Sequence, residues 1–117
     1  MRRMPRQVRP EDSAWSQDLD AAIVAYGTAV RMQIIRQLRI DGPSMRYQIQ
    51  DATSINPSVL TQSLRKLEST GVVIANLPAG ERSTRALTYA IDETRANRLL
   101  LLIAQYVQAD CEISADS

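Results

Sequence analysis

Residues 56–71, NPSVLTQSLRKLESTG, carry the strongest structural signal in the chain. Asn56 is a favourable N-cap, and Pro57 suits the first position of a helix, where no backbone N–H is needed. Gly71 can adopt the left-handed conformation that ends a helix. The leucines recur at spacings of three and four residues and therefore share the inward side: Leu60, Leu64 and Leu67. The pattern predicts one amphipathic helix between Asn56 and Gly71.

The outward side of this predicted helix carries short hydrogen-bonding side chains and ends in a cation, with Lys66 beside it. We call four of these residues the polar ridge: Ser58, Thr61, Gln62 and Arg65. Such side chains can read base edges and hold phosphates in a major groove. A merely solvated helix face could carry the same residues, so the neighbouring elements must decide between the two interpretations.

Length and charge set the bounds on function. At 117 residues the chain is expected to form one domain, and dimerisation would help so small a core. With 14 basic and 13 acidic residues the net charge is only +1, so nucleic-acid binding must depend on where the cations lie. Lys66 is the only lysine. A preference for arginine suits bidentate contacts to guanine or phosphate, but a GC-rich genome would produce it equally.

Enzymatic and metal chemistry are disfavoured. The chain has no histidine and one cysteine, Cys111, which excludes an internal disulfide and argues against a zinc site. We find no nucleophile paired with a base and no phosphate-binding glycine loop, so no enzyme and no cofactor are predicted. Asp92 and Glu93 are interpreted as a helix cap and a dipole complement, and Cys111 as an incidental thiol instead of a redox sensor.

No targeting or membrane segment is recognisable. The amino terminus is basic but leads into Pro5 instead of an apolar run, and the most apolar stretch, residues 99–104, is far too short to span a membrane. We expect a cytoplasmic, nucleoid-associated protein with no membrane or metal partner. Residues 1–12, rich in arginine and proline, are expected to be a basic flexible arm, either a loose tail or a contact to a DNA backbone or minor groove.

Residues 13–110 are expected to form the folded domain, which begins with three helices. The first starts near Ser13 or Ser16, and the second, capped by Thr28, ends at Asp41-Gly42-Pro43. The first helix has an apolar stripe of Trp15, Leu19, Ile23 and Tyr26. The residues expected on the inward side of the second helix are Val30, Ile34 or Ile35, and Leu38. A short third helix from Arg46 to Thr53, with Ile49 and Ala52 inward, leads through Ile55 into the helix after Asn56, which predicts a helix–turn–helix.

After Gly71 the pattern changes to strands. Residues 72–77 are β-branched and short, and Leu87, Tyr89 and Ile91 alternate with smaller or polar residues. The two segments predict a β-hairpin, called the wing below, whose tip carries Arg82 and Arg85. Charges on a hairpin tip usually only aid solubility, but beside a helix–turn–helix they can reach a flanking phosphate.

Asp92 is expected to cap a final helix that runs to about Asp110, followed by a disordered acidic tail over residues 111–117. Residues 99–104 are apolar around the whole circumference of this helix, which one small core cannot absorb. A second copy of the chain is the simplest partner for the exposed side.

This order of elements resembles the winged helix–turn–helix repressors of the ArsR family and their MarR-like relatives. The similarity covers residues 20–91 and is clearest in three stretches: GTAVRMQIIRQL at 27–38, NPSVLTQSL at 56–64 and LESTGVV at 67–73. It implies a mainly α fold with a small β-hairpin wing, flanked by helices that form a homodimer. The polar ridge would read the groove. Backbone contacts would come from Asn56, Lys66, Arg82 and Arg85. The dimer contacts would be Trp15, Leu19, Leu99, Leu102, Ile103 and Tyr106.

The chain also departs from the family pattern. Ser63 stands where many members have histidine, and Thr53 and Ser54 replace an apolar–glycine pair before the turn. The cysteine and histidine clusters that sense metals in the family are absent, so metal sensing is not carried over.

These observations favour a sequence-specific regulator of transcription that binds double-stranded DNA, most simply a homodimeric repressor on an inverted repeat. Two alternatives share the fold. One is a phage or plasmid accessory protein that binds DNA in recombination or replication control. The other is a winged-helix module for protein assembly without DNA binding. The polar ridge, with neither exposed apolar nor acidic residues, favours DNA.

Overall fold

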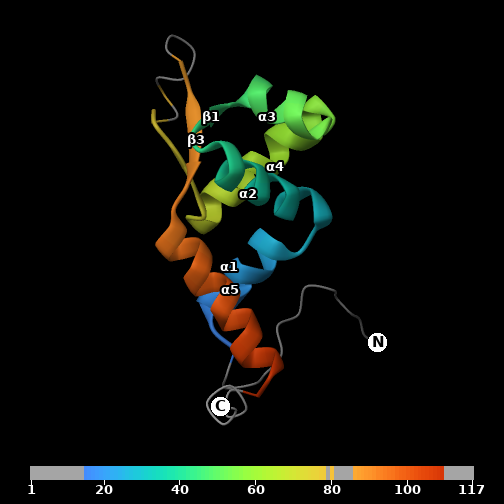
Figure 1. Cartoon of the computed structure of the whole chain (residues 1–117). Coiled ribbons are helices and arrows are strands. Elements are labelled where there is room, and N and C mark those ends of the chain that lie inside the picture. Colours follow the sequence, from blue (N-terminus) through green and yellow to red (C-terminus); the bar gives the residue numbers. More distant parts are fainter. Residues whose placement is uncertain (1–14, 79, 81–85, 110–117) are drawn as a thin grey trace, which may run out of the picture.

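The computed structural model describes residues 15–78, 80 and 86–109, which form five helices and three strands (Figure 1). In chain order these are α1 (Gln17–Tyr26), α2 (Ala29–Asp41), β1 (Ser44–Met45), α3 (Arg46–Thr53), α4 (Pro57–Thr70), β2 (Val73–Ala75), β3 (Thr88–Ile91) and α5 (Glu93–Val107). The basic arm, the wing tip with Arg82 and Arg85, and the acidic tail with Cys111 lie outside the described residues. No helix in the described ranges is long and apolar enough to cross a lipid bilayer.

Side-chain caps begin the helices where the sequence predicts them. Ser16 accepts a hydrogen bond from the backbone N–H of Leu19, so α1 starts at the second of the two predicted positions. Thr28 and Asp92 cap α2 and α5 in the same way. Glycines with positive φ end two of the helices, with φ of 77° at Gly42 after α2 and 85° at Gly71 after α4. These boundaries confirm the predicted helix order.

The helices α3 and α4 form the predicted helix–turn–helix. Ser54 adopts a left-handed conformation with φ of 60° in the turn, and Ile55 is buried beneath it. Ile49 is fully buried as expected, but Ala52 is exposed, so its predicted inward position is wrong. The helix has only eight residues, and the half-buried Thr53, whose hydroxyl donates to the carbonyl of Ile49, takes the inward place instead.

The wing belongs to a three-stranded antiparallel sheet with the order β1-β3-β2. Val73 pairs with Ile91 and Ala75 with Tyr89, which confirms the predicted hairpin. The two-residue strand β1, in which Ser44 pairs with Tyr89, was not predicted. The strand β2 is also shorter than predicted, because the side chain of Asn76 closes the ladder by accepting from the N–H of Thr88 at 2.8 Å.

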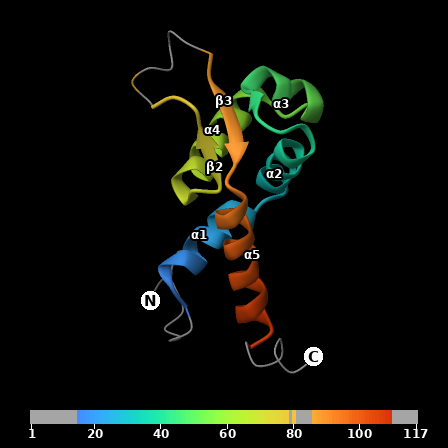
Figure 2. The ribbon, with the colours of Figure 1, turned by 60° about the vertical axis from the view of Figure 1, so that its left-hand side comes forward.

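The core joins all five helices to the sheet. The three leucines of α4 are buried as predicted, with Leu60, Leu64 and Leu67 exposed by 1% or less. In α1 the inward side consists of Leu19, Ala22 and Ala25, while Ile23 is 46% exposed, so the predicted stripe is wrong at this position. The small alanines allow α1 to pack closely against α4 and α5. As a result α1 and α5 lie side by side at one end of the molecule, and the helix–turn–helix and wing lie at the other (Figures 1 and 2).

Candidate nucleic-acid interface

The amino-terminal end of α4 is fixed by Asn56. Its side-chain oxygen accepts hydrogen bonds from the N–H groups of Ser58 at 2.9 Å and Val59 at 3.4 Å. The hydroxyl of Ser58 also donates to this oxygen, at 2.9 Å. Because the oxygen is engaged in the cap, Asn56 can offer an external ligand only the N–H donors of its amide.

Most of the polar ridge is exposed, as the sequence predicts. Ser58, Gln62 and Arg65 are exposed together with Lys66, whereas Thr61 is half-buried. In the part of the chain that the structure describes, no hydrogen bond or ion pair engages the side chains of Gln62, Arg65 or Lys66. Their donors and acceptors therefore face solvent and are available to a ligand.

A cation that the sequence analysis missed lies beside the ridge. Arg46, the first residue of α3, donates from Nη1 to the hydroxyl oxygen of Thr61 at 2.8 Å. The two residues are fifteen positions apart and meet only because α3 and α4 cross. No periodic pattern within one helix could have indicated this contact. The face thus carries three exposed cations, from Arg46, Arg65 and Lys66.

Three arginines around the start of α5 take part in ion pairs. Arg39 lies 2.9 Å from Glu93, and Arg95 and Arg98 both approach Asp18, at 3.3 and 3.6 Å. The exposed cations on the outer face of the helix–turn–helix therefore keep their positive charge, whereas these three arginines have acidic neighbours. This local distribution is what an anionic partner would meet.

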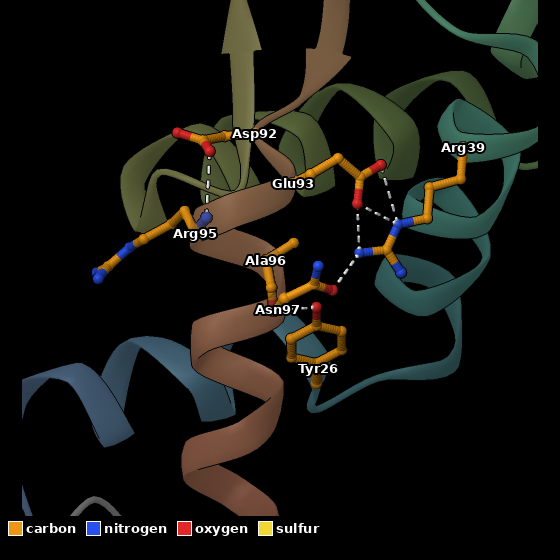
Figure 3. A network of polar contacts seen from close by, with 7 residues as sticks. All are labelled: Tyr26, Arg39, Asp92, Glu93, Arg95, Ala96 and Asn97. Carbon is orange, nitrogen blue, oxygen red and sulfur yellow. Dashed lines mark hydrogen bonds and ion pairs between the residues drawn. The ribbon is translucent and has the colours of Figure 1, made fainter.

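Polar contacts join α5 to α1, α2 and the end of α4, and those to α1 and α2 are drawn in Figure 3. On one side, Arg39 of α2 binds Glu93 and donates to Asn97 at 3.0 Å, and the Tyr26 hydroxyl donates to the carbonyl of Ala96 at 2.8 Å. Burial raises the pKa of Tyr26, an effect that nearby Arg39 opposes, so the neutral hydroxyl that donates this bond is favoured.

On the other side of α5, Arg95 reaches the end of α4. Its Nε donates to the carbonyl of Thr70 at 2.9 Å, and a Cβ on Gly71 would lie only 3.3 Å from the same atom. Glycine at position 71 therefore suits the positive φ and leaves room for the side chain of Arg95. Arg95 fixes the carboxyl end of α4 just as Asn56 fixes its beginning.

The expected dimer contacts divide into two groups. Leu19 and Leu99 are only 3% and 0% exposed in the single chain, so they belong to its core, and their predicted place in a subunit interface is corrected. The other four side chains are half-buried and pack against that core: Trp15, Leu102, Ile103 and Tyr106. The rings of Trp15 and Tyr106 make an edge-to-face contact with centroids 5.1 Å apart.

Several exposed apolar residues of this end were not predicted as contacts. Leu100 and Leu101 of α5 are 46% and 50% exposed, and α1 adds Ile23 and Val24. We call these four residues the apolar face.

Among the described residues, no group of three histidine, cysteine, aspartate or glutamate side chains could hold a metal ion.

No protein-family model and no curated protein sequence matches this chain. Solved structures do share its fold. An ArsR family transcriptional regulator superposes with a TM-score of 0.61 at 15% identity, over 80% of this chain and 96% of that one. The antimony-specific transcriptional repressor AntR gives 0.57 at 14% identity, over 94% and 98% of the two chains. The transcriptional repressor BigR from Xylella fastidiosa gives 0.52 at 20% identity, over 77% and 81%.

These likenesses establish the fold. The chain is a mainly helical winged helix–turn–helix with a small antiparallel sheet, as the sequence predicted. The resemblance to ArsR-type regulators is confirmed at the level of the fold.

Proposed function

We propose that the chain is a transcriptional regulator that binds double-stranded DNA in a sequence-specific manner, as a homodimeric repressor on an inverted repeat. The observation that carries the proposal is the outer face of α4, where Gln62, Arg65 and Lys66 are exposed and without partners among the described residues. The shared fold of known regulators supports the same function.

The dimensions of α4 suit a major groove. Its 14 residues span about 21 Å at a rise of about 1.5 Å each, and a B-form major groove about 12 Å wide admits such a helix. In the groove, the amide of Gln62 matches the N6 and N7 atoms of adenine, and the guanidinium of Arg65 matches O6 and N7 of guanine. Phosphate contacts are assigned to Lys66, to the amide of Asn56, and to Arg82 and Arg85 of the wing tip.

The apolar face supports a homodimer built at the opposite end of the molecule. A second copy would cover Leu100 and Leu101 and place two α4 helices in successive major grooves, about 34 Å apart. Binding across a promoter would then block transcription. Replacing Leu101 with glutamate should convert the dimer to a folded monomer in sedimentation experiments. Ile40→Glu is a matched control, because Ile40 is 62% exposed at the end of α2 and lies outside the apolar face.

The salt dependence of binding tests the proposal. Duplexes selected from a random library should bind, and the logarithm of the association constant should fall linearly with the logarithm of salt, by about 0.9 per phosphate neutralised. Lys66→Met should weaken binding to every sequence and reduce the slope by about one. The control Arg98→Met removes the same charge from α5 and should leave the slope unchanged. Absence of binding at low salt would refute the proposal and favour an assembly module.

A further inference from the structure

The hydroxyl of Thr61 differs from three other hydroxyls in and beside α4. Thr53, Ser69 and Thr70 each donate to a carbonyl of their own helix, at 2.8, 2.6 and 2.7 Å. Such bonds use the only hydrogen that a hydroxyl can donate. Among the described residues, no carbonyl receives the hydrogen of Thr61. Its donor is therefore available on the outer face.

Arg46 determines how that hydroxyl can act. A guanidinium has only N–H donors, so in the 2.8 Å contact the oxygen of Thr61 must be the acceptor. The hydroxyl hydrogen must then point away from Arg46. Accepting a bond from a cation also polarises the O–H group and makes it a stronger donor. The hydroxyl of Thr61 can therefore donate a hydrogen bond to an acceptor on the DNA, and it is poorly suited to accept one from a second donor.

The contact also restrains Arg46. The side chain is exposed, and an unrestrained arginine would lose much rotamer freedom on binding a ligand. Here one of its N–H groups is already held by Thr61, which keeps the planar guanidinium against α4 and leaves its other donors for an anion. Holding a side chain near its bound position reduces the entropy lost on binding.

We propose that Arg46 and Thr61 form a preorganised DNA-contact pair, in which Arg46 binds a backbone phosphate while it holds Thr61 as a donor to an acceptor in the groove. The acceptors that fit are N7 of a purine, O6 of guanine and O4 of thymine, whereas the amino group of cytosine is excluded. This inference rests on the proposed function and adds to it a residue outside α4 and a direction for the hydrogen bond of Thr61.

The experiment is a double-mutant cycle with Arg46→Ala, Thr61→Val and the double variant, measured by fluorescence anisotropy on one selected duplex. Valine keeps the shape of threonine and removes the hydroxyl. Each single change should weaken binding about tenfold. The loss of affinity in the double variant should be clearly smaller than the product of the two single losses, because each residue orients the other for DNA contact. Thr61→Ser should recover most of the affinity lost in Thr61→Val, and Arg46→Ala should also lower the salt slope by about one.

A second arm tests the direction of the hydrogen bond. Single purines of the duplex are replaced in turn by 7-deazapurines, which lack the N7 acceptor. At one position this replacement should weaken binding of the wild type but not binding of Thr61→Val. Thymine positions are scanned in the same way with an analogue that lacks O4, and guanine positions with one that lacks O6. If no substitution separates the two proteins, or if the cycle is additive while Gln62→Ala still weakens binding, the pair is refuted and the proposed function stands. If the wild type binds no duplex, the proposed function itself fails.

Discussion

Replacing Asn56 with aspartate should separate the stability of α4 from its affinity for DNA. The oxygen of Asn56 caps the helix through the N–H groups of Ser58 and Val59. Aspartate keeps such an oxygen and adds a negative charge at the positive end of the helix dipole, whereas alanine removes the cap. The same substitution removes the amide N–H groups that are assigned to a phosphate contact. It also adds a negative charge that repels the DNA backbone.

The magnitudes follow from these contacts. Loss of the cap in Asn56→Ala should lower the free energy of unfolding by about 1 kcal/mol, which lowers Tm by about 3–6 °C for a domain of this size. Asn56→Asp should retain this stability and add about 0.3–1 kcal/mol from the dipole. The new carboxylate would repel one phosphate about 4 Å away. The repulsion energy is about 1 kcal/mol with the dielectric constant of water and about 4 kcal/mol with the lower effective value near a protein surface. Binding should therefore weaken at least about fivefold.

Thermal unfolding by circular dichroism and DNA binding by anisotropy at about 0.1 M salt measure the two effects on the same samples. The expected result is that Asn56→Asp is at least as stable as the wild type and binds DNA more weakly than Asn56→Ala. Equal DNA affinity of Asn56→Asp and the wild type would show that the start of α4 does not approach the backbone, and would refute the reasoning.

Three further predictions concern α5 and the DNA contacts. Tyr26→Phe should lower the free energy of unfolding by about 1 kcal/mol in urea at neutral pH. Because burial raises the pKa of Tyr26, its stabilisation should be complete below pH 10 and lost as pH rises through the folded value, and Tyr26→Phe should lack this alkaline component. Arg95→Met should leave the carbonyl at the end of α4 unpaired and lower stability by about 1–3 kcal/mol in the same urea assay. In DNA binding, Arg65→Ala should cost about 1–3 kcal/mol and relax sequence preference, whereas Arg82→Ala should weaken all sequences alike.

Local signals explain why the order of the elements could be predicted. A cap such as Asn56 or Asp92 acts within three residues, and a glycine such as Gly71 acts on its own backbone, so both are visible in a short stretch of sequence. The leucine spacing of α4 likewise depends on one helix only. Ala52 was misjudged because a helix of eight residues has too few positions to define its inward side by spacing.

Features that depend on pairing between distant segments were not predictable. The strand β1 has two residues and exists only through its register with β3, and the Arg46–Thr61 contact depends on how two helices cross. Because residues 99–104 of α5 are apolar on all sides, the sequence indicated that one side packs on the core and another is exposed, but it did not indicate which residues form each side. Leu99 was therefore expected at a partner, although it is buried in the core, and the more exposed Leu100 and Leu101 were overlooked.

The most direct test of the central claim compares the DNA sequences that the wild type and Gln62→Ala enrich from the same random duplex library. Gln62 is exposed on α4 and its side chain makes no hydrogen bond among the described residues, so its removal should leave the fold intact. The wild type should enrich an inverted repeat, and Gln62→Ala should enrich the same repeat with the preference lost at one position in each half-site. Identical preferences for the two proteins, or no enriched sequence for the wild type, would contradict the claim that the outer face of α4 reads DNA.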